Sequence, residues 1–121
     1  MSQNWWLSVG YKKIGYFPAR LFSNMITADK VGWGGLTVTP AATTSPAMGS
    51  GVYPDGNFRK SCYFRNVAYQ TVSRKFIGPA KELTSTFNNC PNCYNVLYYG
   101  DKGGDFGYSL QFGGPGCDCG N

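Results

Sequence analysis

Hydrophobic and polar residues alternate along much of the chain with the two-residue period that is typical of β-strands. The clearest case is residues 60–72, which place Tyr63, Arg65, Val67 and Tyr69 on one face. The same pattern, bounded by glycine or proline, predicts further strands at residues 4–9, 11–17, 31–39, 93–99 and 105–112. Gly10 joins the first two strands, and "GDKGG" between the last two suits a β-hairpin loop.

One segment departs from this period. Pro18 opens residues 18–30, in which Leu21, Phe22, Met25 and Ile26 fall at helical spacing. Proline is well suited to the first turn of a helix. We therefore expect one short helix of about three turns, with its apolar stripe packed on the sheet that follows.

These elements predict an all-β fold, an antiparallel β-sandwich or the C-terminal half of one, with one short helix. The composition agrees, because 17% of the 121 residues are aromatic and 17 residues are glycine. The length predicts a single domain over residues 1–121. The long loop that follows residue 39 is rich in Pro, Gly, Ser and Thr, which is typical of a lid or a binding loop.

The charge pattern points away from nucleic acid and membranes as partners. The net charge of +5 reflects few acidic residues, and Lys and Arg are scattered, some as short pairs, with no run of five or more. No stretch reaches the length of about 20 apolar residues that spans a bilayer, and the first ten residues lack a secretory signal. Five cysteines nevertheless favour an oxidising compartment. A chain that begins inside a longer secreted protein would explain both observations.

Little in the sequence supplies acid–base chemistry. The chain has no histidine, which excludes Ser-His and Cys-His catalysis within it. Glu82 is the one glutamate, and its surroundings ("GPAKEL") predict a solvated loop residue. The five aspartates lie mostly in turn contexts, and we expect Asp101 and Asp105 beside the hairpin loop to be solvated turn residues.

The cysteines form two closely spaced pairs, "CPNC" (Cys90, Cys93) and "CDC" (Cys117, Cys119). Four thiolates from two such pairs can hold tetrahedral zinc, and we keep a zinc-stabilised module as an alternative. One or two structural disulfides explain the pairs more simply, so no cofactor or metal is predicted. Because the number of cysteines is odd, at least one is unpaired or bonded to another chain.

Several segments, taken in order, resemble the C-terminal half of the neprosin domain, a plant family of glutamic endopeptidases that cleave around proline. They are "WWL" (5–7), "GYFPARLF" (15–22), "VGWGG" (31–35), "SPAMGSG" (45–51), "CYFRNV" (62–67), "PNCYNV" (91–96) and "FGGPG" (112–116), and together they span nearly the whole chain. The resemblance implies a secreted, extracellular β-sandwich protein. It also implies that Cys93 is bonded to Cys117 or Cys119, with Cys62 and Cys90 departing from the family pattern.

The resemblance also bears on catalysis. In the family, the strand with paired glycines reads W-G-G-E, and its glutamate is one of two facing catalytic carboxylates. This chain has Leu36 at that position and lacks the family's N-terminal half, which holds the other carboxylate. Leucine can neither accept nor donate a proton, so we predict no catalytic residue and a truncated, inactive domain. Uncovered sheet edges would then favour association.

The cleft itself is expected to remain. Gly34 and Gly35 leave room for a substrate backbone, and Trp33 either stacks on a proline ring or packs in the core. The loop with Met48, Gly49 and Ser50 is expected to border the same groove. A secreted, non-catalytic module that binds peptide, proline-rich protein or cell wall is therefore the second interpretation.

Overall fold

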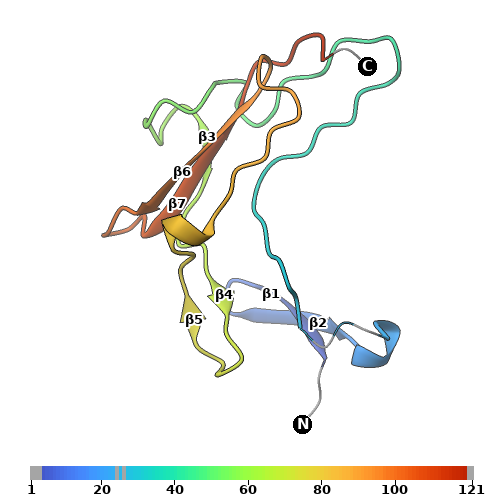
Figure 1. Ribbon diagram of the computed structural model, residues 1–121, viewed down its shortest axis with the longest axis vertical. Helices are drawn as coiled ribbons and strands as arrows, with labels where there is room; N and C mark the ends of the chain where they lie inside the picture. The colour runs from blue at the N-terminus through green and yellow to red at the C-terminus, as the bar shows by residue number, and fades with distance from the viewer. Residues whose placement is uncertain (1–3, 24, 26, 120–121) are drawn as a thin grey trace. The chain divides into compact units, whose positions relative to one another are not determined.

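The computed structural model describes residues 4–23, 25 and 27–119. The chain divides into two compact units, Met1–Gly32 and Trp33–Asn121. All strand pairs in these units are antiparallel, and they form separate sheets of two, three and two strands (Figure 1). The expected all-β class is confirmed. No helix among the described residues has the length and apolar character needed to cross a membrane.

The first unit is built on a β-hairpin. Strands β1 (Trp5–Val9) and β2 (Lys12–Phe17) pair in the register Trp5↔Phe17, with Gly10 in the left-handed conformation (φ 58°) at the turn. This turn explains why glycine separates the two expected strands. The ring of Trp6 lies 5.0 Å from that of Tyr16 across the strands, and both side chains are about half exposed.

The expected three-turn helix after Pro18 is wrong. The chain forms a single 3-10 turn, η1 (Ala19–Leu21), and residues 24 and 26 of the expected helix lie outside the described residues. Phe22 leaves the helical path and contacts the rings of Trp5 and Phe17 at centroid distances of 6.2 and 6.3 Å. A short isolated helix is marginal without a surface to pack on, and Leu21 remains 63% exposed.

The second unit centres on strand β7 (Tyr108–Gly113), which lies between β3 (Cys62–Phe64) and β6 (Asn95–Asp101). The β6–β7 hairpin is the one expected from the sequence. Residues 109–111 and 113 of β7 are buried, as a strand with neighbours on both edges should be. The Asp101 carboxylate accepts a hydrogen bond from the Gly103 N–H in the connecting loop, which is the turn role expected of this residue.

The long strand expected at residues 60–72 is interrupted. It becomes β3 followed by β4 (Tyr69–Gln70), because Asn66 between them is left-handed (φ 53°). The Asn66 N–H donates to the Phe106 carbonyl, so the chain turns toward the hairpin loop. A second small hairpin pairs β4 with β5 (Phe76–Ile77), and the 3-10 turn η2 (Lys81–Leu83) follows.

The strand expected at residues 31–39 is also wrong. This segment is extended but pairs with no strand among the described residues. Its apolar side chains are largely in solvent, with Leu36 89% and Val38 81% exposed. The alternation of polar and apolar residues therefore predicted a strand where the segment is held by side-chain hydrogen bonds from Thr37 and Thr39.

Candidate functional site

Two of the segments expected to form the cleft do lie together. Met48 forms a β-bridge with Gly114, in which the Met48 N–H donates to the Gly114 carbonyl (3.0 Å). The side chain of Met48 packs directly against the backbone of Gly35. Residues 33–36 and the loop 45–51 are thus neighbours, as the sequence suggested.

The paired glycines have different surroundings. A Cβ atom at Gly35 would lie 2.5 Å from Met48 Sδ and 2.9 Å from both Met48 Cγ and Phe112 Cδ2. On the side where a Cβ atom would lie, the space beside Gly35 is therefore filled by the chain's own side chains. At Gly34 nothing lies within 4 Å of that position, so the expected approach of a substrate backbone stays a prediction for Gly34. Trp33 beside it is partly exposed.

Tyr94 forms hydrogen bonds with both segments, residues 33–39 and the loop 45–51. This residue is 6% exposed, and its hydroxyl donates to the Pro46 carbonyl (2.7 Å) and accepts from Thr37 Oγ1 (3.3 Å). A second link joins Thr39 Oγ1 to Ser45 Oγ at 2.9 Å. These hydrogen bonds explain why residues 33–39 stay extended without a strand partner.

Gly49 is required by the turn that follows Met48. It is left-handed (φ 65°), and a Cβ atom there would lie 2.9 Å from Cys62 Cβ. The Gly51 N–H donates to the Met48 carbonyl and closes the turn. Ser50 at its tip is exposed, where it is available to a ligand.

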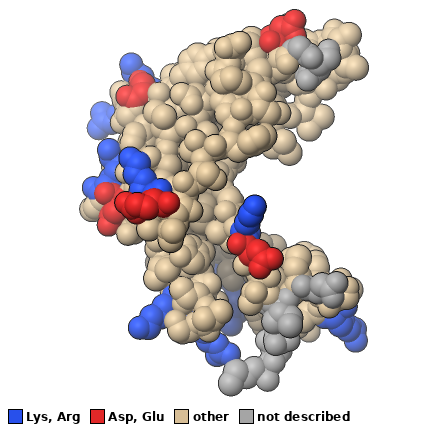
Figure 2. Space-filling view, viewed as in Figure 1, with Lys and Arg blue, Asp and Glu red and all other residues tan. Residues whose placement is uncertain are grey.

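The position at which the resemblance leads us to expect a glutamate holds an exposed leucine. Leu36 has no ionisable group, and it lies beside the packed Gly35. All six acidic residues of the chain, Glu82 among them, are exposed. Figure 2 shows acidic and basic side chains beside one another in several places on the visible face. Exposed carboxyls of this kind lack the apolar surroundings that are typical of a catalytic general acid.

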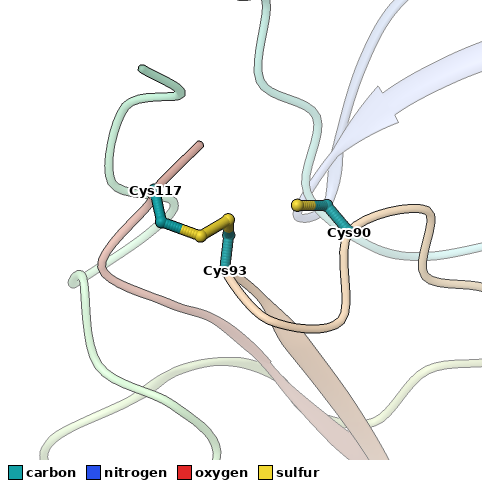
Figure 3. A group of neighbouring side chains, drawn as sticks. All are labelled: Cys90, Cys93 and Cys117. Carbon is teal, nitrogen blue, oxygen red and sulfur yellow. A yellow bond between two sulfur atoms is a disulfide. The ribbon is translucent and has the colours of Figure 1, made fainter. Parts of the chain in front are cut away.

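The four paired cysteines are brought together at the open end of the β6–β7 hairpin. Disulfides join Cys90 to Cys119 and Cys93 to Cys117, and the Cys90 sulfur points toward the Cys93–Cys117 pair (Figure 3). The pairing of Cys93 with Cys117 is one of the two that the resemblance implied. Cys62 forms no disulfide with any described residue, so the expected unpaired cysteine is identified. Each disulfide stabilises the fold by about 3 kcal/mol in the chain-entropy treatment.

One buried polar centre was not anticipated from the sequence. Gln111 on β7 is fully buried, and its Oε1 accepts hydrogen bonds from the Gly56 N–H (2.9 Å) and the Tyr99 hydroxyl. Its Nε2 has no hydrogen-bond partner among the described residues. Burial raises the pKa of Tyr99, the Gly56 amide lowers it, and the Asp55 carboxylate raises it. Glutamine within an alternating strand gives no signal of this burial.

The pKa of the neighbouring Tyr98 is also raised. Burial is the main cause, and Tyr108 and the Asp101 carboxylate add to it. The Tyr98 hydroxyl donates to the Pro79 carbonyl and so ties β6 to the segment before η2. Both tyrosines therefore stay neutral and hydrogen-bonded at physiological pH.

The comparison with protein families agrees with the residues that carry the resemblance. The family model described as Neprosin matches residues 1–115. No solved structure matches the chain. A match over nearly the whole sequence means that this chain belongs to the neprosin family.

Proposed function

We propose that this chain is a non-catalytic member of the neprosin family that binds peptide beside Trp33 without cleaving it. The observation that carries the proposal is the exposed Leu36 at the position of the family's glutamate. Glutamic peptidases need one carboxylate to activate water and a second group to protonate the leaving amide, and each contributes roughly 10²- to 10⁴-fold. A hydrocarbon side chain supplies neither step.

Proteolysis of a proline-containing peptide at acidic pH tests the loss of activity. We expect no cleavage by the wild-type chain, and none by Leu36→Glu, because the six native acids are exposed and unsuited to act as its partner. Mass spectrometry of the peptide would identify any products. Cleavage that disappears when the tagged chain is depleted from the sample would refute the proposal, since depletion excludes a contaminating peptidase.

Retained peptide binding is supported by the surroundings of Gly34. The backbone there is open, and the partly exposed ring of Trp33 precedes it. A proline ring can stack on the face of tryptophan, and burying about 40 Å² of apolar surface in this way contributes about 1 kcal/mol. We propose a proline-rich peptide or protein as the ligand and, given two disulfides, an extracellular location.

Titration calorimetry with a proline-rich peptide tests this part. Trp33→Ala should weaken binding by about fivefold to tenfold, whereas Trp6→Ala, the same change at a half-exposed tryptophan of the first unit, should leave it unchanged. Equal effects of the two changes, or no binding at millimolar peptide, would contradict a ligand site at Trp33.

A further inference from the structure

The four cysteines at the open end of the β6–β7 hairpin include three whose sulfur atoms are close enough to share a metal ion. The sulfur atoms of Cys93 and Cys119, which belong to different disulfides, lie 3.3 Å apart. Those of Cys90, Cys93 and Cys117 all lie within 4.8 Å of one another (Figure 3). In a tetrahedral zinc site with Zn–S bonds of about 2.3 Å, neighbouring sulfurs are about 3.8 Å apart. Three of the sulfurs therefore already lie within a space of about that size, and the Cys119 sulfur, outside this group of three, is next to that of Cys93.

The backbone that carries these sulfurs is held by bonds that do not depend on the disulfides. The N–H groups of Cys93 and Tyr94 both donate to the Cys90 carbonyl, at 3.1 and 3.0 Å. The Asn88 side chain accepts from the Cys90 N–H (3.0 Å) and donates to the Tyr94 carbonyl (2.6 Å). The turn that positions Cys90 and Cys93 is thus closed by four hydrogen bonds, none of which involves sulfur.

The second cysteine pair is placed opposite by the sheet. Asn95 at the start of β6 pairs with Gly113 at the end of β7. The segment that enters β6 and the segment that leaves β7 therefore lie at the same end of the hairpin. The Cys117 carbonyl accepts from the buried Ser45 N–H (2.9 Å), which anchors the C-terminal pair. Reduction would therefore release four thiols that the backbone still directs toward one point.

We propose that the reduced chain binds one Zn²⁺ through the thiolates of Cys90, Cys93, Cys117 and Cys119. Each disulfide takes two electrons from a reductant such as a phosphine and two protons from water, and the oxygen of that water converts the phosphine to its oxide. The four thiols then lose four protons as they bind the ion. Two equivalents of a small-molecule disulfide, each accepting two electrons and released as two thiols, re-form the two protein disulfides and expel the metal, because disulfide sulfurs are not thiolate ligands. The same four residues thus stabilise the hairpin end in either redox state.

Metal binding by the full chain, reduced with a phosphine, tests this proposal. We expect one Zn²⁺ per chain in the presence of a chromophoric chelator, and a thiolate-to-metal charge-transfer band when Co²⁺ replaces zinc. The oxidised chain should bind none. Cys62→Ser is the matched control and should keep full binding, because Cys62 lies outside the cluster.

Substitutions within the cluster separate metal binding from a general loss of structure. Cys93→Ser should abolish stoichiometric binding. Cys119→His, which keeps a zinc ligand at its position, should retain one Zn²⁺ per chain with a weaker charge-transfer band. No zinc bound by the reduced wild type, binding retained by Cys93→Ser, or no binding by Cys119→His would overturn the proposal.

Discussion

The packing of Met48 against Gly35 allows the role of the paired glycines to be measured. Gly35→Ala would place a methyl group 2.5 Å from Met48 Sδ and 2.9 Å from Phe112 Cδ2. The thioether can rotate away, but the ring of Phe112 is stacked on Phe64 with centroids 5.3 Å apart and has less freedom. Overpacking of this kind costs about 1–3 kcal/mol, and we expect a loss of about 2 kcal/mol.

Gly34→Ala is the matched control for this change. Its methyl group would meet nothing within 4 Å, so we expect no loss and a gain of up to about 1 kcal/mol from the stiffer unfolded chain. Urea unfolding, followed by circular dichroism with the disulfides intact, gives both values. With a slope of about 1–2 kcal/mol per molar urea, the expected loss lowers the midpoint by about 1–2 M.

A double-mutant cycle then identifies the cause of the loss. In a Met48→Ala background the methyl group at position 35 meets Phe112 but no longer the thioether, and Phe112 can shift into the space that Met48 leaves, so Gly35→Ala should cost about 1 kcal/mol less than in the wild type. Equal midpoints for Gly35→Ala and Gly34→Ala would refute the packing argument. Unchanged stability with weakened peptide binding by Gly35→Ala would instead favour the substrate role first expected from the sequence.

Three further changes test other parts of the second unit. Gln111→Leu leaves the Gly56 N–H and the Tyr99 hydroxyl without their acceptor and should cost about 1–3 kcal/mol in urea unfolding; a smaller loss in a Tyr99→Phe background would confirm the shared bond. The pKa of Tyr98 is raised in the folded state, so this residue contributes stability that is fully present below pH of about 10 and is lost as the pH rises through the folded-state pKa. The free energy of unfolding should therefore fall less steeply with alkaline pH in Tyr98→Phe than in the wild type. Thiol titration of the denatured, unreduced chain should give one thiol, lost in Cys62→Ser; two or more would contradict the disulfides.

The sequence predicted the elements whose signals are local. The β1–β2 hairpin follows from aromatic alternation around Gly10, and the β6–β7 hairpin follows from two alternating segments around a glycine-rich loop. Prediction from the sequence pattern failed where a contact with a distant residue determines the backbone conformation. Residues 31–39 alternate like a strand. Their position depends on Tyr94, which accepts a hydrogen bond from Thr37 and donates one to Pro46 in the neighbouring loop, and no local pattern reveals that link.

In the candidate site, too, the sequence predicted some neighbours correctly but not the contacts that depend on distant residues. The family motifs correctly brought Gly35 and Met48 together and limited the partner of Cys93 to two residues. They could not show that Met48 fills the space beside Gly35, because this depends on the bridge between Met48 and Gly114. The pairing of Cys90 was equally hidden, since two closely spaced cysteine pairs can combine in more than one way.

The position of the two disulfides has a consequence for how the second unit tolerates damage. They join the segment before β6 to the segment after β7, on the side of the hairpin away from the exposed loop 102–107. A protease that cuts after Lys102 would therefore separate the polypeptide without separating the molecule. The two fragments would stay linked through sulfur, and the ladder between β6 and β7 would keep its partners at high effective concentration.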